Sequence, residues 1–338
     1  MSTRSSPETT RETVRARLAP FQVPSVPRGI GQVASTLLPY FAIVGAMYAL
    51  MDVSVWLTLA LTIPAAGLVV RTFIIQHDCG HGSFFRSRRA NEALGWVCSV
   101  ITLTPFANWR RQHANHHAVW NNLDRRAEGA DIYSTCLTVD EYRALSPFRR
   151  RIYRAVRHPF VALVLIPPLV FIVLYRVPFD TPASWRRERL SVYATDVAVG
   201  IVLATLIWLL GVWPVLLVQL PIMVIASIVG VWIFAVQHKF DDAVWLRQDG
   251  WNSTTASLEG SSYLRLPRVL QWFTGNIGFH HLHHLAPRVP NYRLLECHRA
   301  CPEISGQARS LSFWEALQAP RYNLWDEAQG RLVPFADA

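Results

Sequence analysis

Charged side chains are scarce in this sequence of 338 residues. Asp, Glu, Lys and Arg together make up 17% of it, whereas about a quarter is usual for soluble domains. Apolar residues make up 51%, which excludes a disordered or fibrous chain. Because these residues fall in blocks long enough to cross a bilayer, the composition predicts a membrane protein.

Lysine is almost absent. The 33 basic residues outnumber the 23 acidic ones, but Lys239 is the single lysine, and no long basic run is interleaved with aromatic residues. The sequence therefore predicts no nucleic-acid binding, despite a net charge of +10. Arginines beside apolar spans are instead typical of loops on the cytoplasmic side of a membrane.

Cysteine is also rare, and its pattern excludes a disulfide framework. The cysteines are odd in number and form no CxxC pair: Cys79, Cys98, Cys136, Cys297 and Cys301. We expect free thiols in a reducing compartment. Residues 1–32 lack the early apolar core and the small-residue cleavage site of a secretory signal peptide. They are expected to form an N-terminal cytosolic arm.

Four long apolar blocks predict two helical hairpins. Val33 to Leu50 and Val53 to Ile75 are joined by Met51-Asp52, and Val192 to Val212 and Val215 to Val236 are joined by Trp213-Pro214. A helix needs about 20 apolar residues to cross a bilayer, so each block is long enough. The predicted fold class is all-α, an integral-membrane protein with four transmembrane helices.

Two further apolar segments are predicted not to cross. Ala93 to Ala107 is short for a span, and Phe160 to Val177 contains Pro167-Pro168 and has arginines on both flanks. Since excess arginine marks the cytoplasmic side, both flanks of this second segment prefer that side. We expect two re-entrant or interfacial helices under a histidine-rich cytosolic cap. The membrane domain would cover residues 33–301, and residues 302–338 would form a C-terminal cytosolic tail.

The number of crossings decides which polar stretches share a side. With two crossing hairpins, the N-terminus and residues 76–92, 108–159 and 237–338 all face the cytoplasm. If all six segments crossed in turn, residues 108–159 and 237–338 would lie on opposite faces. The number of crossings matters because the histidines lie in these polar stretches and can meet only if the stretches share a side.

Nine of the 12 histidines fall in three short clusters within these polar stretches. Residues three or four apart project from the same face of a helix. By this rule eight imidazoles can converge: His77, His81, His113, His116, His117, His280, His283 and His284. His281 points about 100° away from His280 and is expected to be structural or to support a ligand. His238, where the last span emerges, is a ninth candidate ligand.

So many imidazoles predict a metal site, because packing titratable rings together without a metal is unfavourable. A zinc site uses three or four protein ligands, so eight or nine histidines suit two ions. Imidazole binds Zn, Cu, Fe and Ni, which leaves the metal open. A carboxylate often orients a ligating ring. Asp78 and Asp124 are our preferred candidates for this role, ahead of Asp131, Asp241 and Asp242.

The clusters resemble the three histidine boxes of the integral-membrane fatty acid desaturases and hydroxylases, which have the forms HxxxH, HxxHH and HxxHH. The resemblance is closest to the acyl-lipid desaturase branch that includes the Δ12 type, and it covers about residues 35 to 300. It rests on HDCGHGSF at 77–84, TPFANWRRQHANHHA at 104–118, Asn122-Leu123-Asp124, and TGNIGFHHLHHLAPRVPNY at 274–292.

This resemblance implies a non-haem di-iron centre on the cytoplasmic side of a four-span protein. Such an enzyme uses O₂ and two electrons to remove two hydrogens from a fatty acyl chain, leaving a double bond and water. The first box matches His77 and His81, the second His113, His116 and His117, and the third His280, His283 and His284, while His238 matches the extra histidine after the last span.

The resemblance also implies partners and a location. The acyl chains of membrane lipids would be the substrate. The sequence has no cysteine-ligated iron–sulfur motif and no fused haem domain, so a separate ferredoxin or small cytochrome would supply electrons. The expected location is a bacterial inner membrane.

Other functions stay open at this stage. A hydroxylase, an epoxygenase or a carotenoid oxygenase on the same scaffold would use the same histidines and differ in where the substrate carbon lies. A metal transporter would hold its ligands near the bilayer midplane on broken helices, whereas these histidines lie at span ends and in polar loops. Residue spacing encodes neither the position of a new double bond nor the group that carries the acyl chain.

Overall fold

The computed structural model describes residues 11–129 and 135–337. Its longest helices are α2 (Val26–Leu50), α3 (Val55–His81), α9 (Arg186–Leu210) and α10 (Val212–Val236). Each has 25 or 27 residues and is apolar enough to cross a membrane. The predicted all-α fold with four membrane-spanning helices is confirmed.

The turn of the first hairpin contains a serine that caps α3, and the turn of the second hairpin contains a glycine. Ser54 begins α3, and its hydroxyl accepts the N–H of Leu57. α9 ends at Leu210, directly before Gly211, whose φ of 86° suits glycine. Trp213-Pro214, predicted as the second link, instead lies in the first turn of α10, where a proline is tolerated.

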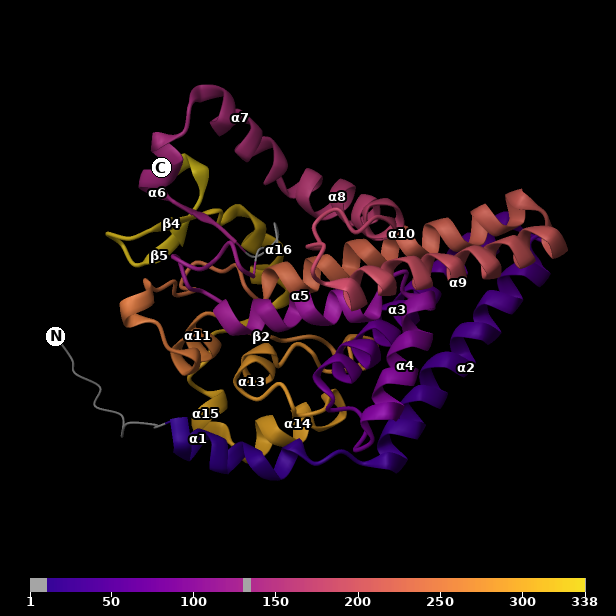
Figure 1. The fold of residues 1–338 in the computed structure, drawn as a ribbon, viewed down its shortest axis with the longest axis horizontal. Coiled ribbons are helices and arrows are strands. Elements are labelled where there is room, and N and C mark those ends of the chain that lie inside the picture. The colour runs from indigo at the N-terminus through magenta and orange to yellow at the C-terminus, as the bar shows by residue number, and fades with distance from the viewer. Residues whose placement is uncertain (1–10, 130–134, 338) are drawn as a thin grey trace.

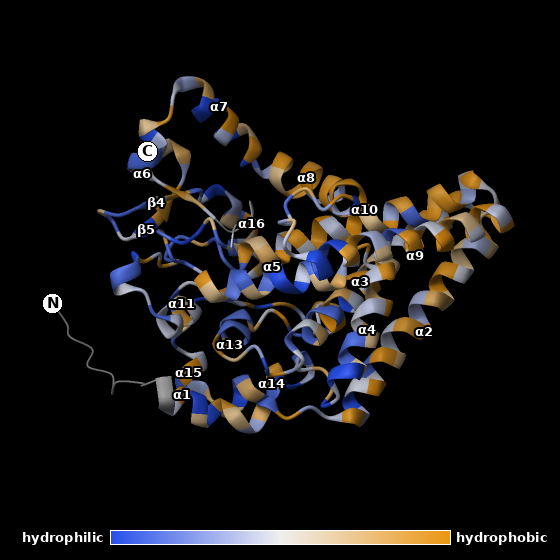
Figure 2. Cartoon of the chain, in the orientation of Figure 1, coloured by the Kyte–Doolittle hydropathy of each residue, from blue (hydrophilic) through white to orange (hydrophobic). Residues whose placement is uncertain are grey.

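The long helices extend to one end of the molecule, and most of the shorter elements gather at the other end (Figure 1). We call the second end the cap. Figure 2 shows that apolar residues dominate α2, α9 and α10. Large apolar side chains are exposed there, among them Leu38 at 69% and Trp208 at 82%. Such exposure is typical of helices that contact lipid.

Ion pairs tie the long helices to the cap at one end of each hairpin. Arg28, near the start of α2, pairs with Glu296 of α14 (Asn291–Ala300) at 2.8 Å. Glu188, near the start of α9, pairs with Arg111 of α5 (Phe106–Val119) at 3.2 Å. Both hairpins therefore have their open ends at the cap and their turns at the far end.

The short apolar segment at 93–107 does not form the single helix that we expected. α4 (Arg88–Ile101) ends within this segment, and α5 begins at Phe106 near the end of it. Leu103, between them, has a φ of 52°, and Pro105 disfavours a helical conformation at the residue before it. The break allows α5, which carries the second histidine cluster, to run in a new direction.

The proline-containing segment is helical but irregular. α7 (Pro147–Val156) meets residues 161–176 at an angle of 53°. Within the latter, α8 (Ile166–Pro168) is flanked by wider π-helical turns at Val161–Leu165 and Leu169–Val173. By length and composition, α7 and residues 161–176 together could count as a fifth span.

Both flanks of this segment nevertheless contact the cap. Before it, the hydroxyl of Tyr153 accepts the N–H of Leu137 at 3.0 Å. After it, Asp180 accepts a hydrogen bond from Gln112 of α5 at 3.0 Å. The segment thus starts and ends on the same side, as predicted for a segment that dips in and returns.

Residues 302–337 contribute strands to the cap. β4 (Leu324–Asp326) pairs with β1 (Leu137–Thr138) in parallel and with β5 (Arg331–Val333) antiparallel, and β3 (Ser310–Leu311) pairs with β2 (Tyr263–Leu264). Trp325 is buried in one cluster with Trp120 and Phe240. At the other end of the chain, α2 begins at Val26, within the stretch 1–32.

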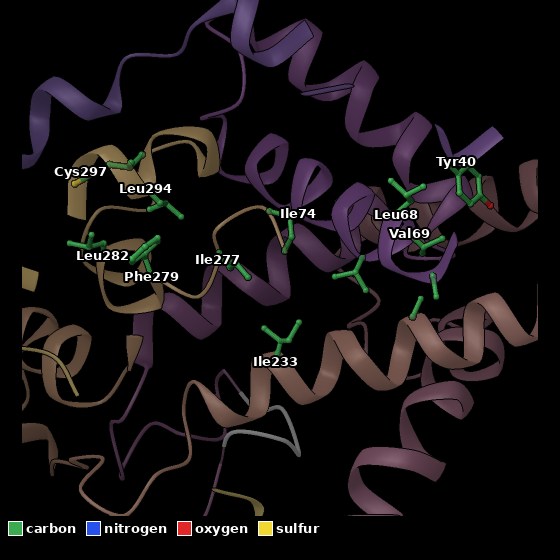
Figure 3. Close-up of a cluster of buried hydrophobic side chains, with 14 of the residues drawn as sticks. Tyr40, Leu68, Val69, Ile74, Ile233, Ile277, Phe279, Leu282, Leu294 and Cys297 are labelled. Atoms are coloured by element: carbon green, nitrogen blue, oxygen red, sulfur yellow. The ribbon is translucent and has the colours of Figure 1, made fainter. Parts of the chain in front are cut away.

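The other described helices are short: α1 (Arg11–Leu18), α6 (Val139–Ala144), α11 (Ser253–Glu259), α12 (Arg268–Phe273), α13 (His280–Leu285), α15 (Pro302–Ser305) and α16 (Phe313–Gln318). The largest buried apolar cluster connects α3 and α10 to α13. Figure 3 shows Val69 and Ile74 of α3, Ile233 of α10, and Ile277 and Phe279, which lead into α13. Each such side chain contributes about 1.5–3 kcal/mol on burial, so this packing fixes the first histidine cluster against the third.

Candidate metal centre

The first histidine cluster lies in the last turns of α3. His77 and His81 are four residues apart and therefore share a helix face. α3 ends directly after His81 because Gly82 adopts a φ of 66°, a left-handed conformation common at helix ends. The N–H of Gly82 donates to the carbonyls of Asp78 and Cys79, which holds this end of the helix.

The second and third clusters lie on α5 and α13. The chain reverses just before α13 through Gly275 and Asn276, whose φ values are 52° and 59°. A Cβ atom on Gly275 would lie 2.8 Å from the side chain of Ile74 in α3. The absence of a side chain at this position therefore allows the third cluster to approach the first.

Five imidazoles from three helices form one group, which we call group one: His77, His81, His113, His117 and His283. Each offers one ring nitrogen, and these nitrogens lie within 4.8 Å of one another. The Nε2 atoms of His81 and His113 are 3.0 Å apart, as are those of His117 and His283. Residues that are distant in sequence thus converge on one point.

Four further imidazoles form group two beside group one: His116, His238, His280 and His284. The Nε2 of His280 lies 2.9 Å from that of His238 and 3.2 Å from that of His284. The rings of His117 and His284 stack at 4.2 Å between centroids, so the two groups are in contact.

α5 and α13 each contribute to both groups. On α5, His113 and His117 face group one and His116 faces group two. On α13 the division is reversed, because His280 and His284 face group two and His283 faces group one. The pattern HxxHH thus supplies one ring to one side and two to the other, since positions i and i+4 are displaced from i+3 around the helix.

The distances between the rings fit metal ions better than hydrogen bonds among the rings. An imidazole nitrogen carries either one N–H or one lone pair. The Nε2 of His117 nevertheless has two close neighbours, the Nε2 of His113 at 3.1 Å and that of His283 at 3.0 Å. Nitrogens bound to one ion at about 2.1 Å lie about 3.0 Å apart when the bonds are perpendicular. The nine side chains could therefore hold two ions.

The protonation state of the rings also suits metal binding. Burial, followed by the neighbouring imidazoles, lowers the pKa well below the ordinary value for His113, His117, His238, His280, His283 and His284. These rings are neutral at pH 7, and neutral imidazole is the form that binds metal.

Asp78 orients the ring of His77. Its Oδ1 lies 3.0 Å from Nδ1 of His77, whose Nε2 faces group one. Its Oδ2 accepts the backbone N–H of Asn291 at 2.6 Å and the side-chain amide of Asn291 at 2.8 Å. Because Asp78 is 1% exposed, these donors rather than water satisfy the carboxylate. A carboxylate in this position fixes the tautomer and direction of a ring.

Asp124 does not have the position that we expected. Its two oxygens accept hydrogen bonds from the guanidinium of Arg247 and the N–H of Gln248, each at 2.8 Å, at the exposed surface. The prediction that Asp124 orients a ligand ring is wrong, because its hydrogen bonds join two loops instead. Asp131 lies outside the described residues.

Two tryptophans pack against the histidine rings, a role that the sequence analysis missed. Trp109 stacks on His113 with centroids 4.6 Å apart, and Trp120 lies 3.8 Å from the ring of His238. The contact of Trp109 could have been predicted from the spacing, because Trp109 precedes His113 by four residues and thus shares its helix face. Both indoles cover part of the surface of the rings.

His281 faces away from both groups, as its position in the third cluster predicts. Its ring lies near those of Tyr263 and His298, at 6.3 Å and 6.2 Å between centroids. Burial lowers the pKa of His281 to about 3. The ring is therefore a neutral part of the packing behind α13.

An apolar cavity of about 210 Å³ begins at the histidines and runs between α3 and α10. His77, His113, His116 and His280 are among the lining residues. Along α10 the lining extends from Gln237 back to Met223, about 21 Å at 1.5 Å per residue. The cavity could therefore hold a long, narrow apolar molecule with one part against the rings.

Four membrane-spanning helices, two adjoining imidazole groups and an apolar cavity define a helical membrane protein with a candidate metal site for an apolar substrate. The model of the fatty acid desaturase family matches residues 54–315. The chain belongs to this family and is accordingly an oxidoreductase. The resemblance inferred from the histidine boxes is confirmed.

Individual relatives agree with this assignment. A fatty acid desaturase of Bacillus subtilis is 40% identical over 319 residues, which are 94% of this chain and 89% of that protein. An sn-1 oleoyl-lipid 12-desaturase of Picosynechococcus is 26% identical over 89% of this chain and 86% of its own length. An endoplasmic-reticulum omega-3 fatty acid desaturase of Vigna radiata is 26% identical over 75% of this chain and 67% of its own length.

Proposed function

We propose that this protein is an acyl-lipid desaturase that inserts a cis double bond at a non-haem di-iron centre. The proposal rests above all on the convergence of nine imidazoles in two adjoining groups at the end of an apolar cavity. Group one would hold one iron and group two the other. Imidazole also suits Zn, Cu and Ni, but zinc has no redox chemistry, and iron is the metal that the resemblance to the desaturase family implies.

The overall reaction balances without a protein nucleophile or a general base. When bound, the irons supply the activation of O₂ and the removal of hydrogen from unactivated carbon. O₂ is reduced to two waters, and the acyl chain supplies two of the electrons and two of the hydrogens. An external donor, a ferredoxin or a small cytochrome, supplies the other two electrons, and solvent supplies two protons.

The residues of this chain position the ligand rings and the acyl chain and exclude water from the centre. Asp78 holds His77, Trp109 and Trp120 exclude water from the rings, and the walls of α3 and α10 align the acyl chain with the centre. Holding a reactant in the correct geometry can supply much of a rate acceleration.

A hydroxylase, an epoxygenase or a carotenoid oxygenase on the same scaffold is the alternative. The names of the relatives favour desaturation of an acyl lipid, since one acts on an oleoyl lipid. Lipid profiling of a host that expresses the chain tests this choice. A new unsaturated fatty acid supports the proposal, whereas a new hydroxy fatty acid would contradict it and leave the iron site in place.

Filling the cavity at Gly230 should impair the enzyme without affecting its metal. Gly230 lines the cavity, and a Cβ atom there would meet no other atom within 4 Å. The side chain in Gly230→Leu can therefore enter the cavity without disturbing α10. Because small displacements of a reactant cost large factors in rate, we expect activity on long acyl chains to fall about tenfold or more. Iron content should remain that of the wild type.

Gly200→Leu is the matched control. Gly200 lies on the exposed surface of α9, and a Cβ atom there also meets nothing within 4 Å. This variant should keep its activity on the same lipids. Equal activity in both variants would show that the acyl chain does not occupy the cavity beside Gly230.

We further propose that the cap faces the cytoplasm of a bacterial cell, because the arginine-rich stretches lie on that side. Labelling of introduced cysteines by a membrane-impermeant maleimide tests this orientation. All five native cysteines are buried, so background labelling should be low. Asp52→Cys, in the turn between α2 and α3, should react in intact cells, whereas Arg321→Cys, in the cap, should react only after lysis. The reverse pattern would place the cap outside.

A further inference from the structure

A second cavity, of about 460 Å³, lies between α2, α3, α12 and α14. Four arginines line it: Arg28, Arg71, Arg268 and Arg299. None of the lining residues is acidic. Arg28 pairs with Glu296, but the other three form no ion pair with any part of the chain that the structure describes. The cavity is therefore strongly cationic.

Arg71 is the most buried of these cations, with 7% of its surface exposed. Its Nε donates to the hydroxyl of Thr36 at 3.0 Å, its Nη1 donates to the carbonyl of Trp272, and its guanidinium lies 4.1 Å from the centroid of the Trp272 ring. These partners fix the side chain but carry no formal negative charge. A buried cation without an anion is unfavourable, so an anion in the cavity would stabilise this arrangement.

Gln32 of α2 adds a second unsatisfied group to the same cavity. Its side chain lines the cavity, is 5% exposed, and donates through Nε2 to Asn291 at 2.8 Å. Its Oε1 is buried and has no hydrogen-bond partner among the described residues. A ligand that offers a hydroxyl beside its negative charge would satisfy both features.

Two of the helices that line the cavity expose apolar side chains. α12 exposes Val269 at 66% and Leu270 at 41%, directly after Arg268, and the first turns of α2 expose Val26 at 48% and Ile30 at 58%. Short segments that combine exposed apolar side chains with arginine lie in the membrane interface. A phosphate held by the arginines would thus have its acyl chains beside apolar protein surface.

We propose that this cavity binds the phosphate headgroup of an anionic phospholipid, at a site separate from the acyl cavity. The phosphate would lie among Arg71, Arg268 and Arg299, and a headgroup hydroxyl would donate to Gln32. Arginine suits this role because its planar group forms two parallel hydrogen bonds to phosphate oxygens. The inference does not depend on the metal or on the reaction catalysed.

Binding to the purified full-length chain in neutral detergent tests the site. Native mass spectrometry would follow dioctanoyl phosphatidylglycerol, dioctanoyl phosphatidylcholine and inorganic phosphate. We expect phosphatidylglycerol to bind at least tenfold more tightly than phosphatidylcholine, and a large excess of inorganic phosphate not to displace it. One arginine at a membrane surface changes affinity for anionic lipid roughly fivefold, so Arg268→Gln with Arg299→Gln should weaken binding roughly 25-fold.

Both substituted arginines are exposed, so the double variant should fold normally. Arg321→Gln, an exposed arginine in the cap outside this cavity, is the control and should bind the lipid as the wild type does. Wild-type lipid affinity in the double variant overturns the proposal. So does effective competition by inorganic phosphate, which would identify a free-phosphate site. Slower reduction by the electron donor with unchanged lipid binding would identify a protein contact and overturn the proposal as well.

Discussion

His117→Ala and His284→Ala are each expected to lower the desaturation rate by more than about a hundredfold, since loss of groups that merely orient a metal ligand already costs about 10- to 100-fold. The two histidines belong to different groups, His117 to group one and His284 to group two. Each variant should therefore lose one of two irons per chain, and it should lose a different one. Metal analysis of the purified protein and lipid profiling of the host measure both effects.

His158→Ala is the matched control for these two variants. His158 is exposed and follows α7, outside both groups. Its replacement should change neither iron content nor activity. All three variants should insert into the membrane, because the long helices bury their apolar contacts independently of the rings. Full activity of His117→Ala or of His284→Ala would contradict the assignment of that residue as a ligand.

The histidines could be predicted from the sequence because helix geometry is local. Positions i, i+3 and i+4 share a face in any helix, so the spacing alone indicated which rings of α3, α5 and α13 could converge. Because two crossing hairpins return the chain to the side on which it started, the three clusters were then predicted to lie on the same side of the membrane. The structure brings together all eight of these rings, and His238 with them.

The division of the rings between two groups could not be predicted in the same way. It depends on how α3, α5 and α13 lie relative to one another, and contacts such as that of Ile74 in α3 with Gly275 before α13, about 200 positions apart, contribute to this arrangement. The break between α4 and α5 was missed because apolar composition continues through Pro105. The cap was underestimated because its strands have only two or three residues each, too few for a period-2 pattern.

The two acids proposed to orient ligands illustrate the same limit. Asp78 and Asp124 both lie close to a cluster in sequence, and sequence distance could not separate them. Asp78 is on the buried face of α3, where its neighbour His77 and the distant Asn291 can both reach it. Asp124 follows the end of α5 and turns toward solvent and Arg247. Burial, which depends on the whole fold, decides which acid meets a ring.

Asp78→Asn should therefore weaken metal binding by group one about a hundredfold, the upper end of the range for groups that orient ligands. The amide has the shape of the carboxylate but only one oxygen. Either the ring of His77 or the two donors of Asn291 must then face an N–H₂ group, so one buried set of hydrogen bonds is lost. Iron retained against increasing chelator concentration measures the effect directly, and a purely structural role would not change that curve.

Asp124→Asn makes the same chemical change on the acid that contacts no ring, and its chelator curve should follow that of the wild type. Elution volume and thermal melting of both variants in detergent report whether each folds. A folded Asp78→Asn protein that holds iron as tightly as Asp124→Asn would show that the orientation of His77 comes from packing alone. Selective iron loss in Asp78→Asn would instead show that Asp78, which accepts hydrogen bonds from Asn291 213 positions away, controls the metal site.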